Sequence, residues 1–249
     1  FLRGFIRRCK PEHLQSLQLV VTGAERLPQG VREAFAEKFG TEPMEGYGTT
    51  ECAPTVAANV PDNVSPGFCA MYVKHGTIGR PMPGQAVRIV DPDTREVLGI
   101  GQAGLLEVTG PNIMVGYLNQ PEKTNAVLHD GWYSTGDIAS LDEDGFIKLT
   151  DRLARFSKIA GEMVPHAKIE DTLHDLLGLA DQAMAVASVP DPQKGERLVV
   201  LHTLDEAQLE ELMGKLDTSG LPNLWRPRAS AFHRINEIPV LGTGKMDIK

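Results

Sequence analysis

A short apolar strand, a glycine turn and an amphipathic helix follow one another near the start of the chain. Residues 17–22 (Leu-Gln-Leu-Val-Val-Thr) are rich in side chains that favour β-strands, and Gly23 ends this run. Pro28 suits the first turn of a helix, and apolar residues recur at helical spacing over residues 31–39. Strand, turn and helix form the repeating unit of an α/β sheet, whose ligands commonly lie beyond the carboxyl ends of its strands. The pattern therefore predicts an α/β domain with a candidate ligand position at residues 23–25.

The pattern changes to short β-like runs over residues 61–109, where glycine and proline interrupt the sequence repeatedly. Two of these runs span residues 86–90 and 105–109, and they predict strands of a small β-barrel-like subdomain. Residues 121–128 can form a short helix, and residues 138–150 indicate a hairpin around an Asp-Glu-Asp-Gly turn.

The last hundred residues alternate between helical and β-type patterns. Residues 165–177 carry a single apolar stripe at helical spacing, and strands are predicted at residues 183–189 and 198–204. A second helix is expected near residues 205–216, which makes this region an α+β module behind a linker at residues 151–157. The chain as a whole is therefore expected to be α/β plus α+β. Its expected regions are residues 1–60, 61–150 and 151–249.

Composition narrows the class of protein. With 249 residues, of which 41% are hydrophobic and 23% charged, the chain has a globular composition. A net charge of −8 and a pI near 5.4 argue against nucleic acid as a partner. The three cysteines have no metal-ligand spacing, which favours reduced thiols in a cytoplasmic setting. No run approaches the roughly 20 apolar residues of a membrane-spanning helix.

Three separated polar segments carry the chemistry. Residues 46–51 (Gly-Tyr-Gly-Thr-Thr-Glu) place an aromatic face beside hydroxyl donors and a carboxylate. Residues 133–137 end in Asp137, a two-oxygen acceptor suited to a sugar diol, and Lys245 lies on a glycine-containing loop at residues 243–245. Joining a carboxylate to the α-phosphate of ATP brings two anions together, so such a site needs Mg²⁺ and a positioned cation. The combination indicates an ATP-using enzyme that activates carboxylates.

Together with residues 104–124, 151–170 and 239–245, these segments resemble the adenylate-forming superfamily of acyl-CoA synthetases, peptide-synthetase adenylation domains and luciferases. The resemblance covers nearly the whole chain. It implies that Tyr47 stacks on adenine, that Thr50 contacts the α-phosphate, and that Glu51 helps to hold Mg²⁺. It further implies that Asp137 accepts hydrogen bonds from the ribose and that Lys245 bridges the carboxylate and the α-phosphate. The nucleotide-binding residues implied in this way are Gly23, Ala24, Glu25, Gly46, Tyr47, Gly48, Asp137 and Arg152.

The superfamily also performs a second step, which the resemblance assigns to residues 151–249. This mobile C-terminal module rotates after adenylation and brings a different face, at residues 158–161, to the acyl-adenylate and a phosphopantetheine thiol. Lys158 lies on that face, and Gly161 is expected to line the thiol tunnel.

Residues 155–164, 194–196 and 239–245 are particularly similar to acyl-[acyl-carrier-protein] synthetases. Many of these are the ligase part of bifunctional 2-acylglycerophosphoethanolamine acyltransferases, which pass a fatty acid from carrier protein to a lysophospholipid. The resemblance therefore implies a fatty acid as substrate and either acyl carrier protein or CoA as acceptor. It also implies a longer parent with an acyltransferase domain, on the cytoplasmic face of the inner membrane.

Two basic runs could meet an acidic carrier protein, although scattered solvated charges explain them equally well. The first run consists of Lys148, Arg152, Arg155 and Lys158. The second consists of Arg226, Arg228 and Arg234.

Some positions depart from the superfamily pattern. The hinge position is Ala154 rather than a charged residue, and Leu105 replaces the glutamate usual after Gly104. The Ser/Thr/Gly-rich phosphate loop of the superfamily does not occur among the 249 residues, and the chain opens at Phe1 within a fold pattern already under way. We therefore expect a piece of a longer enzyme that is inactive as a synthetase by itself.

Two other functions stay open on the sequence. His166 and Asp171 have the spacing of a glycerolipid acyltransferase pair, in which histidine deprotonates a hydroxyl. Five residues apart on a helix, however, they point about 140° away from each other. A non-catalytic module that binds carrier protein or nucleotide is the second alternative.

Overall fold

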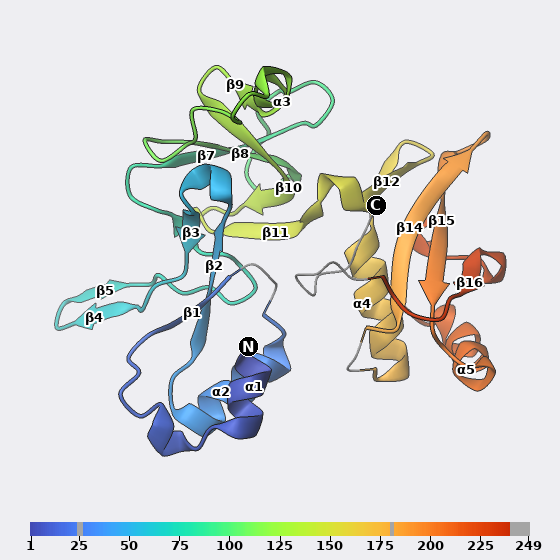
Figure 1. Ribbon diagram of the computed structural model, residues 1–249, viewed down its shortest axis with the longest axis horizontal. Helices are drawn as coiled ribbons and strands as arrows, with labels where there is room; N and C mark the ends of the chain where they lie inside the picture. Colours follow the sequence, from blue (N-terminus) through green and yellow to red (C-terminus); the bar gives the residue numbers. More distant parts are fainter. Residues whose placement is uncertain (24–26, 180–181, 240–249) are drawn as a thin grey trace. The chain divides into compact units, whose positions relative to one another are not determined.

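The computed structural model describes residues 1–23, 27–179 and 182–239, and the chain divides into two compact units. Unit 1 contains residues 1–149, and unit 2 contains residues 150–249. Figure 1 labels most helices and strands of both units. The further division of the first unit at residue 60 stays a prediction.

The start of unit 1 is the expected α/β unit. Strand β1 (Val20–Thr22) pairs in parallel with β2 (Pro43–Gly48), and α2 (Gln29–Phe39) connects them. Strands β3 (Thr55–Ala58) and β6 (Arg80–Pro81) extend the sheet in the order β1-β2-β3-β6. The smaller elements of this region are α1 (Leu2–Arg8), η1 (Pro11–His13), η2 (Thr50–Cys52) and the hairpin of β4 (Asn63–Ser65) and β5 (Phe68–Ala70).

Helix α2 is held to this sheet by an apolar and a charged contact. Phe35 and Phe39 are buried, and their ring centroids lie 4.6 Å apart. Arg32 donates from Nη2 to Glu45 Oε2 on β2 over 2.5 Å, and both side chains are largely buried. The helical spacing read from the sequence therefore marks the face that packs against the sheet.

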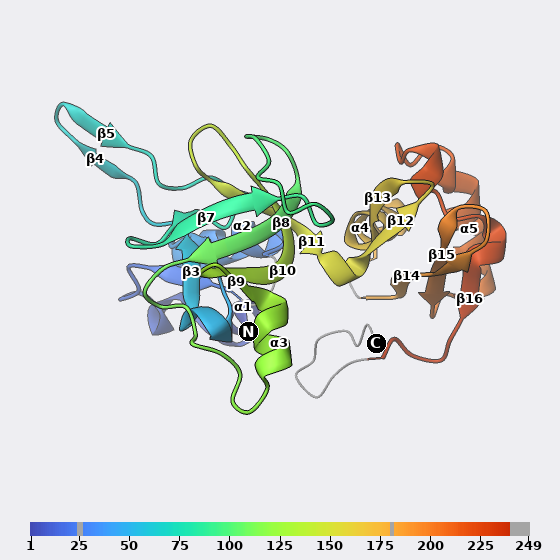
Figure 2. The same cartoon turned by 90° about the horizontal axis from the view of Figure 1, so that it is seen from above.

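The second sheet of unit 1 is curled and antiparallel, with strand order β11-β10-β8-β7 and β9 paired to β10 (Figure 2). Its core contains Ile89, Leu106 and Ile147, all almost fully buried. The predicted strands at residues 86–90 and 105–109, the short helix and the late hairpin are confirmed. The elements are β7 (Ala86–Val90), β8 (Gly104–Thr109), α3 (Pro121–Val127), β9 (Leu128–His129), β10 (Trp132–Leu141) and β11 (Ile147–Arg152).

Unit 2 is an α+β module with strand order β13-β12-β15-β14, and β16 pairs in parallel with β15. Ile169 and Leu173 of α4 are fully buried against Met184, Val200 and Leu212. The predicted class, α/β plus α+β, is thus confirmed. The elements are η3 (Leu153–Arg155), β12 (Phe156–Ile159), β13 (Glu162–Pro165), α4 (His166–Leu177), β14 (Met184–Asp191), β15 (Gly195–His202), α5 (Glu206–Leu216), η4 (Asn223–Trp225), η5 (Ala229–Ala231) and β16 (Phe232–Arg234).

The linker predicted at residues 151–157 is wrong, because these residues form the end of β11, the turn η3 and the start of β12. Asp151 accepts a hydrogen bond from the backbone N–H of Ala167 over 3.1 Å, and Arg155 forms an ion pair with Glu170. These contacts with α4 hold residues 151–157 in place. No local sequence pattern predicts them.

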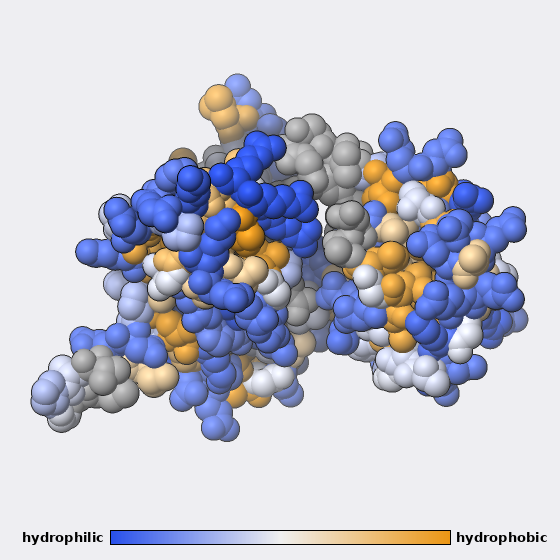
Figure 3. Space-filling view, turned by 90° about the horizontal axis from the view of Figure 1, so that it is seen from below, coloured by the Kyte–Doolittle hydropathy of each residue, from blue (hydrophilic) through white to orange (hydrophobic). Residues whose placement is uncertain are grey.

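Several large apolar side chains of unit 1 are exposed, among them Phe1, Leu19, Val21, Val115 and Leu118. Figure 3 looks onto the side of unit 1 that carries α1 and α2, where apolar surface lies beside strongly hydrophilic surface. Within the described ranges, the helices are all too short or too polar to cross a membrane.

Candidate functional site

Strand β2 ends in the glycine-rich start of the first predicted motif. Gly48 lies so close to the following turn that a Cβ there would sit 2.0 Å from the carbonyl oxygen of Pro54. A backbone atom cannot give way as a flexible side chain can, so only glycine fits. Gly46 is also crowded, since a Cβ there would lie 3.3 Å from Val21 Cγ1. The glycines thus allow the chain to turn sharply after Tyr47.

The segment after β1 reaches the same place. Because β1 and β2 run parallel, Thr22 pairs with Glu45, and Gly23 follows beside Gly46. A Cβ on Gly23 would lie 3.4 Å from the Gly46 carbonyl oxygen. The neighbouring candidates Ala24 and Glu25 lie outside the described residues.

Tyr47 and Asp137 meet although 90 residues separate them: the Tyr47 hydroxyl donates a hydrogen bond to Asp137 Oδ2. Asp137 lies in an irregular part of β10, where the register with β8 shifts between Ser134 and Ile138. Its backbone N–H donates to Thr135 Oγ1 over 3.1 Å. Burial and the neighbouring Asp137 charge raise the pKa of Tyr47, so it stays a neutral phenol.

Glu51 forms the second contact of this region, with Tyr117. The Tyr117 hydroxyl donates to Glu51 Oε1 over 2.7 Å, and Met114 N–H donates to the Glu51 carbonyl oxygen over 2.8 Å. Burial raises the pKa of Glu51, but hydrogen bonds, that of Tyr117 foremost, outweigh this, so the pKa is lowered and Glu51 is an anion. Tyr117 was missed by the sequence reasoning, although it lies in the segment at residues 104–124 that carries the resemblance.

The hydroxyl groups beside Glu51 differ in their surroundings. Thr50 begins η2 and is exposed, so its side chain is open to a ligand. Thr49 Oγ1 is buried near Glu51 and Tyr133, without a well-formed hydrogen bond to any described residue. Buried hydroxyl groups are nearly always hydrogen-bonded in folded proteins, and Glu51 and Tyr133 are the nearby partners for this one.

These groups fit Mg²⁺ as a single-carboxylate site. Among the residues that the structure describes, no three His, Cys, Asp or Glu side chains gather as a metal cluster. Proteins usually hold Mg²⁺ through one or two carboxylates together with substrate phosphates and water. The ionised Glu51 beside Thr49 and Thr50 meets that requirement.

The remaining predicted residues lie in unit 2 or beyond the described part. Arg152 is exposed at the end of β11, and Lys158 is exposed on β12. Gly161 has φ 88° in the two-residue turn between β12 and β13, after Ala160 with φ 50°. Lys245 lies outside the described residues. The structure therefore brings together the candidates of unit 1, and it places Lys158 and Gly161 on one hairpin of unit 2.

A buried polar network surrounds the start of α4. Arg155 pairs with Glu170 and lies 3.6 Å from Asp151, and Glu170 Oε1 accepts from Val186 N–H over 2.7 Å. Burial raises the pKa of Glu170, and Arg155 opposes this shift. The charge of Arg155 is thus matched inside unit 2, although the sequence suggested it as a surface contact.

His166 belongs to the same buried region. Its Nε2 lies 2.5 Å from Ser157 Oγ, and burial, together with Arg155, lowers its pKa to about 4. Asp171 is exposed on α4. A buried histidine and an exposed aspartate do not form the acyltransferase pair that the spacing suggested.

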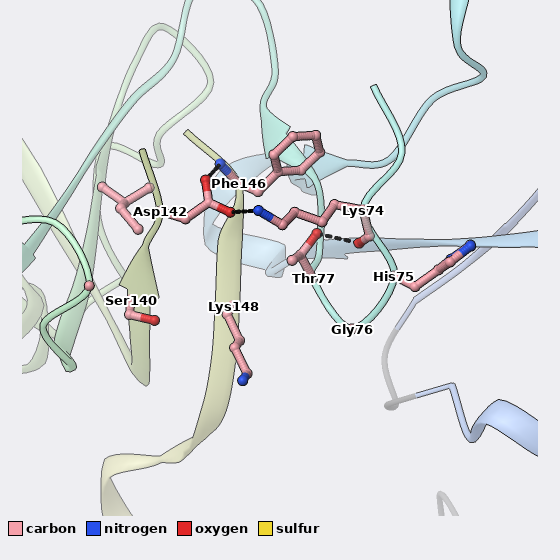
Figure 4. A pocket seen from close by; sticks show the side chains of 10 residues that line it. Lys74, His75, Gly76, Thr77, Ser140, Asp142, Phe146 and Lys148 are labelled. Carbon is pink, nitrogen blue, oxygen red and sulfur yellow. Dashed lines mark hydrogen bonds and ion pairs between the residues drawn. The ribbon is translucent and has the colours of Figure 1, made fainter. Parts of the chain in front are cut away.

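A cavity of about 350 Å³ lies elsewhere in unit 1 and shares no residue with the contacts above. Figure 4 shows that Lys74 reaches across it to Asp142, with Nζ and Oδ2 2.6 Å apart, while Lys148 points away from this pair. Lys74 and Asp142 of this cavity therefore neutralise each other. The residues around Tyr47, Glu51 and Asp137 are the stronger candidate site.

Comparison with known proteins agrees with the arrangement in unit 1. A family model for AMP-binding enzymes matches residues 3–118. The chain is 38% identical over 181 residues to a long-chain-fatty-acid–CoA ligase of Salmonella typhimurium, covering 73% of the chain and 30% of that protein. It is 34% identical over 248 residues to a protein of the same name from Bacillus subtilis, covering 98% of the chain and 42% of that protein. The chain thus spans less than half the length of these curated relatives.

Solved structures give the same result for the fold. The crystal structure of ATP-bound MatB from Rhodopseudomonas palustris matches 98% of this chain and 50% of its own, with 26% identity and a TM-score of 0.69. The two sheets of unit 1 and the α+β module therefore correspond to part of a fold seen with ATP.

Proposed function

Since the chain belongs to the AMP-binding, adenylate-forming superfamily, we propose that it serves the ATP-dependent, AMP-forming activation of a fatty acid. The observation that carries this proposal is the contact between Tyr47 and Asp137, residues far apart in the sequence that meet in unit 1, where Tyr47 is partly exposed and Asp137 is buried. A nucleoside needs both a flat apolar partner for its base and an acceptor for its ribose hydroxyls. Those two residues provide them side by side.

Each residue then has a part that its surroundings allow. The ring of Tyr47 packs on adenine, and Asp137 accepts from the ribose hydroxyls in place of the tyrosine hydroxyl that it holds here. Thr50, which is exposed, donates to the α-phosphate. Glu51 holds Mg²⁺, which offsets the negative charge of the phosphates when it is bound.

The substrate class comes from the relatives, whose names specify long-chain fatty acids and CoA. We propose a second step in which the acyl group passes to a phosphopantetheine thiol, with Lys158 and Gly161 of unit 2 facing the acceptor. The resemblance of residues 155–164 and 194–196 to acyl-[acyl-carrier-protein] synthetases favours carrier protein over CoA. Lys245 is proposed as the cation of the first step on the same resemblance.

Fewer basic residues are available to an acidic carrier protein than the sequence suggested. Arg155 is engaged with Glu170 and Asp151, so reversing its charge would place three carboxyl groups together and disturb unit 2. Arg228 and Arg234 are exposed and avoid this problem. Replacing both with Glu should weaken carrier-protein binding at least fivefold at low salt and spare CoA binding, as measured by calorimetry. Unchanged carrier-protein binding would exclude this surface.

Calorimetric titration of the 249-residue chain with AMP tests the nucleotide site. Stacking on an aromatic ring contributes about 1–3 kcal/mol per base, so Tyr47→Ala should weaken AMP binding at least fivefold. Asp137→Ala should do the same by removing the ribose acceptor, whereas Tyr47→Phe keeps the ring, frees Asp137, and should change affinity less than threefold. Absent AMP binding in the folded wild type, or equal affinities for all variants, would contradict the proposal.

The AMP titration, together with an assay for acyl-adenylate, tests whether the chain is a non-catalytic nucleotide-binding module. If the chain binds AMP through these residues but forms no acyl-adenylate from ATP and a fatty acid, it acts by itself as a nucleotide-binding module. Formation of acyl-adenylate by the chain supports the ligase directly.

A further inference from the structure

The hairpin of β12 and β13 is only weakly tied to its sheet by backbone pairing. Within the hairpin, four residue pairs are in register, from Phe156 with Pro165 to Ile159 with Glu162. Between β12 and β15 the described register contains one pair, Ile159 with Gly195. The hairpin that carries Lys158 and Gly161 therefore needs other contacts to hold its position.

Lys194 and the first two residues of β15 supply those contacts. The Lys194 carbonyl oxygen accepts from Ala160 N–H over 2.8 Å, and Glu196 Oε2 accepts from Lys158 N–H over 2.5 Å. Between them, Gly195 has φ 80°, and a Cβ there would lie 3.3 Å from the Lys158 carbonyl oxygen. The segment Lys-Gly-Glu, which the sequence marked without giving it a role, thus lies directly against the hairpin.

Glu196 is itself held by a second strand. Its Oε1 accepts from Ser188 Oγ on β14 over 2.7 Å, while Oε2 serves β12. One carboxylate therefore joins three neighbouring strands. Glutamine retains one acceptor oxygen and can keep only part of this bridge, and alanine keeps none.

The neighbouring residue on β12, Ser157, is anchored through its side chain by His166. Two consecutive residues of the strand are thus held by different elements: the Ser157 side chain by His166 of α4, and the Lys158 N–H by Glu196 of β15. The turn at Gly161 is left open, because a Cβ there would meet no atom within 4 Å. A rigid base with an open tip is suited to presenting the tip to a ligand.

We propose that Glu196 is a positioning residue for acyl transfer, setting the hairpin that presents Lys158 and Gly161 to the phosphopantetheine acceptor. This inference rests on the proposed function. In the transfer step the acceptor sulfur bonds to the acyl carbon, and the bond from that carbon to the AMP oxygen breaks. AMP leaves with the bonding electrons, and the thiol proton passes to water. Glu196 takes no part in these bond changes and acts through the hairpin.

Backbone amide exchange and chemical shifts of the 249-residue chain, without and with coenzyme A, test the proposal. Glu196→Ala should speed exchange of the Lys158 amide at least tenfold, and should reduce the coenzyme A response at Ala160 and Gly161 at least fivefold. Glu196→Gln should give effects between those of wild type and Glu196→Ala, and AMP affinity, for which Tyr47 and Asp137 are proposed, should stay unchanged.

Glu162→Ala is the matched control, because it removes a carboxylate of the hairpin itself, whereas Glu196 reaches the hairpin from β15. Glu162 accepts from Trp225 Nε1 and not from β12 or β15, so exchange at Lys158 should change less than twofold. Slow exchange at Lys158 in Glu196→Ala, or an undiminished coenzyme A response, would overturn the proposal. If wild type shows a protected Lys158 amide but no response to coenzyme A, the acceptor function falls, and with it this role of Glu196.

Discussion

The polar contacts of the candidate site in unit 1 join distant parts of the sequence, whereas those around α4 in unit 2 join near neighbours. Tyr47 and Asp137 are 90 residues apart, but Ser157 and His166 are only nine apart. The two groups also differ in burial at Glu51 and Tyr117, which are both partly exposed, while Ser157, His166 and Glu170 are almost inaccessible. Asp137 is buried too, but its partner Tyr47 is partly exposed. Such differences separate contacts that a ligand can replace from contacts that hold a fold together.

The physical reason is the cost of breaking each contact. Tyr117 and Glu51 are both partly exposed, so each can exchange the other for water or for a ligand at little cost. A buried ion pair has no such substitute, and removing one partner leaves an uncompensated charge. Variants of the two groups should therefore affect different properties, ligand binding in unit 1 and stability in unit 2.

The largest effect is expected for Glu170→Ala. It leaves the Val186 N–H without its acceptor and Arg155 with only the more distant Asp151, and breaking a buried pair costs about 3–5 kcal/mol. The chain has two tryptophans, Trp132 in unit 1 and Trp225 in unit 2, so each unit has its own fluorescent reporter. Urea unfolding followed by Trp225 fluorescence in a Trp132→Phe background should show this loss in the free energy of unfolding of unit 2.

Glu211→Ala is the control for that measurement. Glu211 pairs with Lys215 over 2.5 Å on the exposed surface of α5, where such pairs contribute under about 1 kcal/mol. A loss for Glu170→Ala no larger than for Glu211→Ala would show that the network around α4 does not stabilise unit 2.

A smaller effect is expected from acid acting on His166. Its pKa is about 4 in the folded unit and about 6.5 in an unfolded chain, so between these values only the unfolded chain binds the proton. The stabilisation is complete above about pH 6.5 and is lost as the pH falls toward 4, by roughly 2–3 kcal/mol. The stability advantage of wild type over His166→Asn, measured by urea unfolding, should therefore shrink between pH 7 and pH 4.5. An advantage that is equal at both pH values would contradict the assignment.

Much of the fold follows from local patterns in the sequence. The helical spacing of residues 31–39 and the apolar run at residues 86–90 locate α2 and β7, because each element buries the face that the pattern marks. The segment at residues 151–157 was mistaken for a linker because its order depends on Asp151 and Arg155 meeting α4. Neither contact produces a periodic pattern of apolar residues in the sequence.

The candidate site, too, could be predicted from the sequence only in part. The motifs around Tyr47 and Asp137 can be recognised singly, but their contact requires the irregularity in β10, which spacing does not reveal. Tyr117 and Glu196 were not assigned, because Glu51 and Lys158, the residues that they hold, lie 66 and 38 residues away. A residue whose role is to hold another is visible only when the fold brings the two together.

The smallest effect is expected for Tyr117→Phe, which removes the hydroxyl that Glu51 accepts. Because the pair is partly exposed, water can replace the lost donor, and unit 1 should lose less than about 1 kcal/mol. The Glu51 pKa should rise toward its ordinary value, since that hydrogen bond helps to lower it. Urea unfolding followed by Trp132 in a Trp225→Phe background and an NMR titration of the Glu51 carboxyl measure the two effects.

Tyr72→Phe is the matched control, because the Tyr72 hydroxyl makes no hydrogen bond to a described residue. It should leave both the stability of unit 1 and the Glu51 pKa unchanged. If Tyr117→Phe instead costs more than about 2 kcal/mol, the Glu51 contact is a structural one like those around α4. Glu51 could then not exchange its partner for a metal ion at low cost, and the distinction between the two units would fail at the residue proposed to hold Mg²⁺.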